Sequence, residues 1–304
     1  MPELFPILRV LVDQSSDNGQ FLILGSASPN LVKKASESLA GRVEFVDLQG
    51  FDLTETGNTK LNRLWIRGGF PRSYLADTNE DSMTWRDGFV RTFLQRDITQ
   101  LGIGIPATTL RRFWTMLAHS HGQILNSSQL GRSMGMNDKT IRSYIDILSD
   151  TYMIRPLQPW FANLKKRQVK SPKVYLTDTG LLHYLLGINN LDTLLGHPVL
   201  GSSWESFAME QIIRNNPGIE PYFWSTYSGA ELDLLLFMKK KKIGIEFKFT
   251  NTPKSTKSMH SAITDLELEK LYVIYPGLEQ YPLHTSIEAI PLSGFIDQIR
   301  KDNS

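Results

Sequence analysis

The chain has 304 residues, of which 41% are hydrophobic and 21% are charged, so it can bury a substantial core and is long enough for roughly two or three domains. Its 33 lysines and arginines nearly balance its 31 aspartates and glutamates, so the net charge of the chain does not predict a nucleic-acid or membrane partner. Any positively charged binding surface must therefore be confined to one part of the chain. The absence of cysteine excludes disulfide bonds and thiolate metal sites and agrees with a reducing compartment.

The first residues lack the features of a signal peptide. The stretch "MPELFPILRVLVDQ" has no basic n-region, no unbroken apolar h-region and no small-residue cleavage site. No apolar run approaches the roughly 20 residues needed to cross a bilayer. We therefore expect a soluble, cytoplasmic protein without a membrane partner.

Residues 1–104 are expected to hold the end of an α/β unit followed by helices. Two apolar runs, "FLILGSAS" (21–28) and "VEFVDLQGF" (43–51), have the pattern of strands buried in a parallel sheet, and a helix over about 29–39 would connect them. Farther along, "MTWRDGFVRTFLQRDITQL" spaces its aromatic residues at helical intervals, which predicts further helices.

Residues from about 105 to 190 have the element order of a winged helix-turn-helix. A helix "TLRRFWTMLAHSHG" precedes "SSQLGRSMG", a turn at "MND" and a second long helix "KTIRSYIDILSDTYMI". Ser127 and Asp138 are suitable N-caps, and Gly135 suits the turn. Two short strands, "MIRPLQPW" and "KVYLTDTG", enclose a basic loop with the character of a wing.

This module predicts contact with DNA. Lys139, Arg142 and Ser143 would begin the recognition helix. The cations of the wing would meet phosphates, namely Lys165, Lys166, Arg167, Lys170 and Lys173. The alternative is that the helices pack within the protein and the basic loop is merely solvated.

Residues 191–304 are expected to form a mixed α/β unit around one hairpin, "GAELDLLLFMKKKKIGIEFKFT" (229–250). A turn centred on Lys240 and Lys241 would put the apolar residues on one buried side and set Asp233 opposite Lys248, with Glu246 one diagonal step away. On an open face this is an ordinary cross-strand pair. On a covered face these charges would be unfavourable unless they share a cation or substrate phosphates.

Metal-assisted hydrolysis would use such a group, because two carboxylates can hold Mg²⁺ while an ammonium positions or activates the attacking water. Asp233, followed after one hairpin by Glu246-Phe247-Lys248, resembles the D…(D/E)-x-K signature of the PD-(D/E)XK nuclease superfamily. The resemblance implies that Asp233 and Glu246 are metal ligands, that Lys248 is the catalytic lysine, and that Glu205 on the preceding helix is their acidic partner. The superfamily also includes domains that keep the fold and lose the chemistry.

Several segments in a fixed order are similar to a large prokaryotic family of AAA+ ATPases: "FLILGSAS", "SESLAGRVEFVDLQGFDLTE", "RGGFPRSYL", "FVRTFLQRDITQL", "KVYLTDTGLLHYLLG" and "ELDLLL…IEFK". The resemblance implies an α/β multidomain chain. Residues 1–104 would be the C-terminal part of the AAA+ core plus a helical lid, residues 105–190 the winged helix-turn-helix, and residues 191–304 a restriction-endonuclease-like α/β domain.

The same likeness implies a partial nucleotide site. Ser26 would be the polar sensor for ATP and Arg42 an arginine finger, while Arg72 and Arg96 would belong to the lid. The structural alternatives are that Arg42 caps a helix C-terminus and that Arg96 pairs with Asp97.

A P-loop, G-x-x-x-x-G-K-[ST], is absent from the sequence. In the family, "PELFPILRVLVD" directly follows the acidic Mg²⁺-binding strand, so we expect the chain to begin just after that strand. ATP would then bind only if a partner supplies the missing part, either another copy or a separate N-terminal ATPase piece. The expected function is that of an AAA+ family protein with a DNA-binding winged helix and a Mg²⁺-dependent nuclease-like domain. The alternative is a non-enzymatic DNA-binding or scaffolding protein.

One pair of histidines has a spacing that zinc sites sometimes use. His119 and His121 are two residues apart at the end of a predicted helix. Solvation at the helix end explains them better than a metal does, so we expect no zinc site there.

Overall fold

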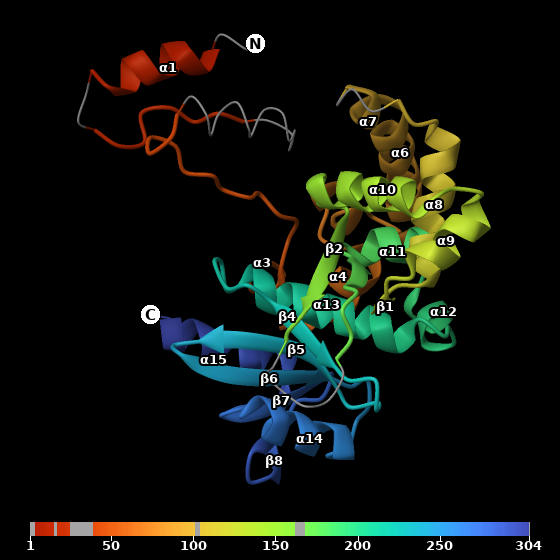
Figure 1. Cartoon of the computed structure of the whole chain (residues 1–304), viewed down its shortest axis with the longest axis vertical. Coiled ribbons are helices and arrows are strands. Elements are labelled where there is room, and N and C mark those ends of the chain that lie inside the picture. The colour runs from red at the N-terminus through yellow and green to blue at the C-terminus, as the bar shows by residue number, and fades with distance from the viewer. Residues whose placement is uncertain (1–3, 15–16, 25–38, 101–103, 162–167, 304) are drawn as a thin grey trace.

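The computed structural model describes residues 4–14, 17–24, 39–100, 104–161 and 168–303 (Figure 1). The helices are α1 (Leu4–Val12), α3 (Leu53–Thr56), α4 (Leu61–Arg67), α5 (Pro71–Tyr74), α6 (Asn79–Thr92), α7 (Ile98–Gln100), α8 (Ala107–His119), α9 (Ser127–Met134), α10 (Asp138–Asp150), α11 (Thr179–Leu185), α12 (Leu191–Leu195), α13 (Leu200–Arg214), α14 (Lys257–Leu266) and α15 (Leu292–Asn303). The strands are β1 (Gln123–Ile124), β2 (Ile154–Pro159), β3 (Lys173–Leu176), β4 (Tyr222–Ser225), β5 (Glu231–Met238), β6 (Lys241–Phe247), β7 (Lys270–Tyr275), β8 (Tyr281–His284) and β9 (Ile287–Pro291).

One mixed sheet runs through most of the described chain. Its nine strands lie in the order β1-β3-β2-β4-β5-β6-β7-β9-β8. The join between its two halves is short, because β2 and β4 pair in parallel only through Gln158 with Tyr222 and Pro159 with Phe223. The mixed α/β fold class is therefore confirmed, and the sheet crosses the boundary expected near residue 190.

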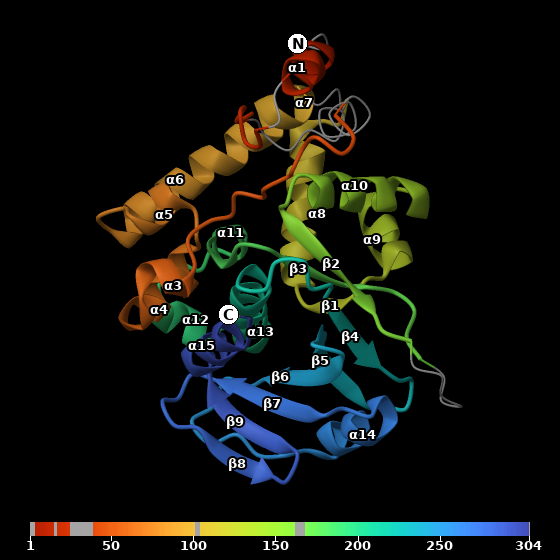
Figure 2. The ribbon, with the colours of Figure 1, turned by 90° about the vertical axis from the view of Figure 1, so that its left-hand side faces the viewer.

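Helices cover both faces of the C-terminal part of the sheet (Figure 2). Helices α13 and α15 pack on one face, where Phe295 and Ile299 join Leu234 and Ile245 in the largest apolar cluster. Helix α14 packs on the other face, where Met259 joins a second cluster. Both faces of β5 and β6 are therefore covered, which explains why their sequences are almost continuously apolar.

The helices predicted after residue 78 are present. Helix α6 continues into a π-helical turn, Phe93–Asp97, and α8, α9 and α10 follow in the expected order. Gly135 ends α9 in the left-handed conformation with φ of 69°, as the turn requires. The predicted N-caps were each wrong by one residue, because Asn126 and Asn137 accept the N-terminal backbone hydrogen bonds instead of Ser127 and Asp138.

The predicted strands of the N-terminal unit are wrong in their described parts. Residues 21–24 and 43–51 have no strand partner, and the side chains of Leu22, Leu24, Val46 and Leu48 are 81 to 97% exposed. A strand is held by a ladder of hydrogen bonds to a neighbour, and among the described residues only the end of the second run makes a backbone bond of this kind, from the Phe51 amide to the Gly69 carbonyl. Ser26 and nearly all of the predicted helix over 29–39 lie outside the described residues.

The turn of the β5–β6 hairpin differs from the prediction by one position. Leu234 pairs with Ile245 and Met238 with Lys241, so the two turn residues are Lys239 and Lys240, with φ of 49° and 67°. The turn still has an even number of residues, but Asp233 comes opposite Glu246 instead of Lys248. Positive φ at both central residues is the geometry of a type I′ turn, which favours Asn-Gly over two lysines.

The predicted single apolar side of the hairpin is also wrong. A bulge in β5 inserts one additional residue between Leu232 and Leu235 relative to β4. Leu232 and Leu235 consequently pack beside α14, whereas Leu234 and Leu236 pack with α13 and α15.

Replacing Lys240 by glycine is expected to raise the free energy of unfolding by about 1 kcal/mol, because glycine has no Cβ to oppose a left-handed backbone. Urea denaturation measures this change. The matched control is Lys241→Gly, at the first residue of β6, which should lower the free energy of unfolding by about 0.5–1 kcal/mol. A destabilised Lys240→Gly variant would contradict the turn geometry.

Candidate functional site

Asp233 lies where the ladder between β5 and β6 stops. The last backbone pair is Leu234 with Ile245, and the Asp233 Oδ2 atom accepts a hydrogen bond of 3.0 Å from the Phe247 amide. The carboxylate thus takes the place of a backbone carbonyl at the end of the hairpin. The bulge of β5 relative to β4 falls at the same place, between Leu232 and Leu235.

Glu246 and Lys248 meet Asp233 at this point. The Lys248 Nζ atom is 2.8 Å from Glu246 Oε2 and 3.9 Å from Asp233 Oδ2. Asp233 is 8% exposed and Glu246 is 5% exposed, whereas the Lys248 side chain is 39% exposed. The structure therefore brings together the three predicted residues, with both acids buried and the lysine side chain partly exposed.

Glu205 reaches the same place from α13. The Tyr175 hydroxyl of β3 donates a hydrogen bond to Glu205 Oε1, and Lys173 Nζ lies 3.7 Å from that oxygen. Lys173 Nζ also contacts Glu231 and is 4.0 Å from Asp233 Oδ1. We call this group the acidic cluster, and its members are Lys173, Tyr175, Glu205, Glu231, Asp233, Glu246 and Lys248.

Burial and the repulsion of nearby carboxylates shift Glu205 and Glu246 toward their neutral forms. Burial, followed by the nearby charge of Asp233, raises the pKa of Glu205 to about 7 and that of Glu246 to about 8. Lys173 and Lys248 oppose these shifts, and the carboxylates around them raise the pKa of each lysine although burial alone would lower it. Negative charge in the acidic cluster is therefore only partly compensated at neutral pH, which favours a further cation or bound protons.

Carboxylate oxygens are the ligands that Mg²⁺ prefers, and Mg²⁺ commonly uses one or two protein carboxylates together with waters and substrate phosphates. Asp233 and Glu246, which share Lys248, fit that limited donor set. Within the ranges that the structure describes, however, no three Asp, Glu, His or Cys side chains converge as a preformed metal-binding group. The acidic cluster therefore fits a cation held through two carboxylates and water, not a protein cage.

Lys173 was predicted to be a wing cation that meets phosphates, and this prediction is wrong. Its side chain is 6% exposed and points into the acidic cluster. The reason is the parallel pairing of β2 with β4, which carries β3 and its side chains onto the C-terminal half of the sheet.

The other predicted site residues lie elsewhere. Lys139 and Arg142 are exposed in the first turns of α10, and Lys165, Lys166 and Arg167 lie outside the described residues. Arg42 forms a bidentate ion pair with Asp13, with Nε 2.5 Å from Oδ1 and Nη2 3.1 Å from Oδ2, and its Nη1 donates to the Ala40 carbonyl. Arg96 pairs with Asp97 at 2.9 Å, as its structural alternative predicted.

The sequence analysis missed Tyr175, and it gave no role to Glu231, which the hairpin pattern places on the same side as Asp233, Glu246 and Lys248. Lys173 and Tyr175 are two residues apart in β3, so strand periodicity places both on one face. Nothing local indicates that this face meets Glu205, because the contact depends on pairing between strands more than sixty residues apart. Glu231 precedes Asp233 by two residues in β5, the spacing that puts both on one side of the strand, but this spacing gives no sign of the contact with Lys173.

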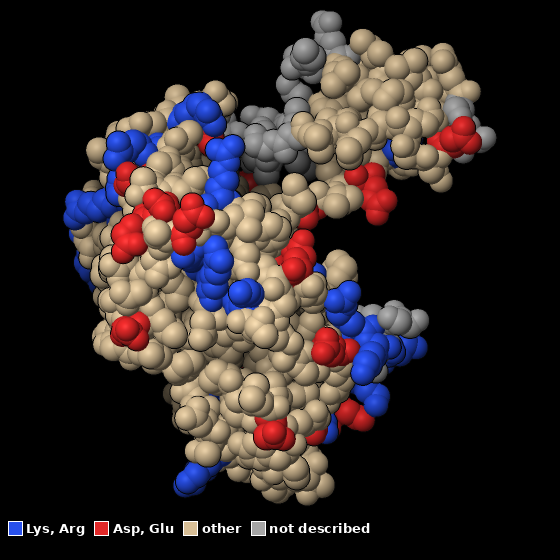
Figure 3. Space-filling model, turned by 180° about the vertical axis from the view of Figure 1, so that it is seen from behind, with Lys and Arg blue, Asp and Glu red and all other residues tan. Residues whose placement is uncertain are grey.

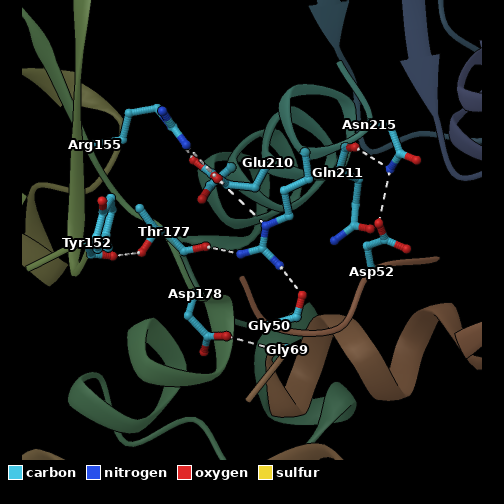
Figure 4. A network of polar contacts seen from close by, with 12 residues as sticks. Gly50, Asp52, Gly69, Tyr152, Arg155, Thr177, Asp178, Glu210, Gln211 and Asn215 are labelled. Atoms are coloured by element: carbon cyan, nitrogen blue, oxygen red, sulfur yellow. Dashed lines mark hydrogen bonds and ion pairs between the residues drawn. The ribbon is translucent and has the colours of Figure 1, made fainter. Parts of the chain in front are cut away.

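Side chains of helix α13 also hydrogen-bond to the backbone of residues 50–53 (Figure 4). Arg214 donates hydrogen bonds to the carbonyls of Gly50, Phe51 and Thr177, and Gln211 Oε1 accepts from the Leu53 amide at 2.8 Å. One turn earlier, Glu210 pairs with Arg155 of β2 at 2.6 Å. A single helix therefore joins residues 50–53, the β2–β3 strands and the acidic cluster.

Asp178 adds a second tie in the same region (Figure 4). Its carboxylate caps α11 through the Leu181 amide and also accepts a 2.7 Å hydrogen bond from the Gly69 amide. Burial raises the pKa of Asp178, while these two backbone donors and nearby arginines act in the opposite direction. The contacts explain Asp178 as a structural residue.

The histidines expected to be solvated behave differently from one another. His119 is exposed at the end of α8, but His121 is buried and its Nδ1 atom accepts a 3.1 Å hydrogen bond from the Leu176 amide. His183 is also buried, with Nδ1 3.2 Å from the Ile66 carbonyl and Nε2 2.8 Å from Ser203 Oγ. Burial lowers the pKa of both His121 and His183 to about 3.

Comparison with known proteins identifies the class to which this fold and site belong. A profile described as "AAA domain" matches residues 1–57, "Domain of unknown function (DUF8612)" matches residues 58–192, and "Domain of unknown function (DUF4143)" matches residues 200–295. The chain belongs to an AAA-like ATPase family.

Two curated relatives of this family come from mycobacteria. They are "Uncharacterized protein Rv2008c" of Mycobacterium tuberculosis and "Uncharacterized protein Mb2031c" of Mycobacterium bovis. Each is 49% identical over 304 residues, an alignment that covers 98% of this chain and 69% of the relative. No solved structure matches the chain. In the part of the chain that the structure describes, every helix is too short or too polar to span a membrane.

Proposed function

We propose that this member of the AAA-like ATPase family acts on DNA and hydrolyses phosphodiester bonds at the acidic cluster with the help of Mg²⁺. The observation that carries the proposal is the convergence of Asp233 and Glu246, both buried, on the partly exposed ammonium of Lys248. A buried acid pair beside an accessible cation is the arrangement that a phosphate substrate and a hard metal ion together would use.

Four residues of the acidic cluster have a definite part in this proposal. Asp233 and Glu246 would hold Mg²⁺, with Glu205 as their acidic partner. When bound, Mg²⁺ supplies charge stabilisation at the phosphoryl oxygens and lowers the pKa of coordinated water. Lys248 would orient the attacking water or a phosphate oxygen, and the Phe247 amide keeps the Asp233 carboxylate in place.

The DNA-binding part of the proposal rests on the middle of the chain. Helices α8, α9 and α10 with β2 and β3 have the element order of a winged helix-turn-helix, and α10 presents exposed Lys139 and Arg142 at its N-terminal end. Lys165, Lys166 and Arg167 remain proposed phosphate contacts. Figure 3 shows lysines and arginines interspersed with acidic residues on one face, so we expect DNA contact to be local instead of spread over the molecule.

Neutralising the exposed end of α10 tests this DNA contact. The double variant Lys139→Ala/Arg142→Ala is expected to weaken DNA binding and to reduce the slope of log affinity against log salt by about 0.9 for each lost phosphate contact. Fluorescence anisotropy over a salt series measures the slope. Lys60→Ala, which removes an exposed lysine far from α10 in the sequence, should leave it unchanged. An unchanged slope in the double variant would count against the proposed interface.

The nucleotide-binding part of the proposal concerns Ser26 and Arg42. Both would face ATP only together with a P-loop, a motif that these 304 residues do not contain. Arg42 would then have to exchange its ion pair with Asp13 for the γ-phosphate.

The second candidate function is a non-enzymatic DNA-binding scaffold. Lys173 favours it, because this buried ammonium already compensates part of the negative charge of Glu205, Glu231 and Asp233. In that case the acidic cluster would only stabilise the junction between the middle and C-terminal parts of the chain.

Incubation with plasmid DNA separates the two functions. With Mg²⁺, the full chain is expected to nick or linearise the plasmid, and EDTA should abolish the reaction. Salt-dependent DNA binding without cleavage at any Mg²⁺ concentration would support the scaffold and overturn the hydrolytic proposal.

A further inference from the structure

Lys173 is a buried cation delivered to the acidic cluster from a different part of the chain. It lies in β3, within the segment matched by one domain profile, whereas Glu205, Glu231 and Asp233 lie in the segment matched by the next. Lysine is rarely buried without compensating acids. Here its side chain is 6% exposed, and its ammonium lies 5.4 Å from the centre of the Phe223 ring.

The surroundings of this ammonium are oxygen atoms from three carboxylates. Its Nζ atom contacts Glu231, is 3.7 Å from Glu205 Oε1 and is 4.0 Å from Asp233 Oδ1. These acids project from α13 and β5, so no single local turn creates the arrangement. The ammonium thus lies among Glu205, Glu231 and Asp233, on one side of the Asp233 carboxylate that the proposed Mg²⁺ site uses.

This position explains why the acids do not form a preformed metal group. Carboxylates that share a central cation can approach one another, whereas a lysine side chain separates them with its own bulk and directs their oxygens toward three N–H donors. Among the described residues, the acidic cluster therefore already contains two protein cations: the Lys173 ammonium near one oxygen of Asp233 and the Lys248 ammonium near the other.

We infer that Lys173 is the resident counter-cation of the acidic cluster and that divalent cations bind there in competition with it. The inference rests on the proposed function for the location of the cation site. It adds that Lys173 limits how tightly a divalent cation binds at that site. Because β2 and β4 pair through only two residues, the position of β3 sets how firmly Lys173 fills the cluster.

Thermal unfolding without DNA tests the inference. The melting temperature of the full chain is measured in a MgCl₂ series and in NaCl of the same ionic strength, for the wild type, Lys173→Met and the control Lys170→Met. Lys170 lies three residues earlier and is exposed. Lys173→Met should melt lower than the wild type in NaCl, recover in MgCl₂, and bind Mg²⁺ at least tenfold more tightly. The wild type and Lys170→Met should respond weakly and equally.

The result that overturns the inference is an equal response of wild type and Lys173→Met to MgCl₂. If Lys173→Met does not fold, Lys173→Gln replaces it, because the amide keeps hydrogen-bonding capacity without the charge, and the same outcomes apply. Failure of the proposed function appears separately, as absence of DNA cleavage. A Mg²⁺ response confined to the Lys173 variants would then uphold the counter-cation while the hydrolytic proposal fell.

Discussion

Lys248→Ala is expected to lower the rate of Mg²⁺-dependent DNA cleavage by at least about 100-fold, the usual loss when a positioned proton-transfer or charge-stabilising group is removed. Lys248 is the one member of the Asp233–Glu246–Lys248 group whose side chain is partly exposed, so it is the member that a phosphate can meet directly. Its removal also deprives Glu246 of a 2.8 Å hydrogen bond and should raise the pKa of that acid further.

The matched control for this variant is Lys241→Ala. Lys241 is the first residue of β6, at the turn end of the hairpin, where it pairs with Glu269 on the surface, whereas Lys248 directly follows the last residue of that strand. Its loss should leave cleavage unchanged. Because the Lys248 side chain is partly exposed, both variants should keep a circular dichroism spectrum and melting temperature close to those of the wild type. Undiminished cleavage by folded Lys248→Ala would remove the catalytic assignment.

The second large effect concerns the buried histidine His183. Burial lowers its pKa from an ordinary value of 6.5 to about 3, so the unfolded chain binds a proton between these values and the folded chain does not. The stability from neutral His183 is therefore present above pH 6.5 and is lost as the pH falls toward 3. At pH 5 the loss amounts to about 2 kcal/mol.

Comparison with His183→Gln isolates this term. The amide can still bond Ser203 and the Ile66 carbonyl but does not titrate, so the stability advantage of the wild type over the variant should shrink by about 2 kcal/mol between pH 7.5 and pH 5. Glu205 and Glu246 have raised pKa values and change stability in the opposite direction between about pH 4.5 and 8, but both proteins contain them. Urea denaturation at each pH measures the difference, and His119→Gln, at an exposed site, should show none. A constant difference would show that His183 is not the titrating group.

The alternation of residues in the hairpin predicted the candidate site, because it constrains whether the turn has an even or odd number of residues more strongly than it constrains where the turn lies. Four consecutive lysines, residues 239–242, contain no glycine or asparagine that would mark the turn. The prediction therefore misplaced the turn by one residue, yet an even-length turn still brought Asp233, Glu246 and Lys248 together. The bulge near the start of β5 had no sequence signal, although Asp233 lies within it and accepts its hydrogen bond from the Phe247 amide there.

The errors of the sequence analysis share a dependence on distant partners. The apolar runs at 21–24 and 43–51 have a strand-like composition, but no described segment pairs with them. Lys173 looked like a solvated wing residue because its neighbours in the sequence are basic. Its true environment is created by β4 and β5, which follow it by about fifty residues or more. Local pattern predicted elements well and predicted the contacts between them poorly.

Helix α13 connects residues 50–53 with the acidic cluster. Gln211 and Arg214 hold residues 50–53, and Glu205 lies about two turns earlier on the same helix. A shift of the N-terminal segment would therefore act on the helix that supplies an acid to the cluster.

The most direct test of the central claim is the single-turnover rate of DNA duplex cleavage as a function of Mg²⁺ concentration, for the wild type and Asp233→Asn prepared in parallel. We predict a rate that rises and saturates with Mg²⁺ for the wild type and falls below about one hundredth of that value for Asp233→Asn, with DNA affinity unchanged. Equal rates for the two proteins, or no cleavage by the wild type at any Mg²⁺ concentration, would contradict the account.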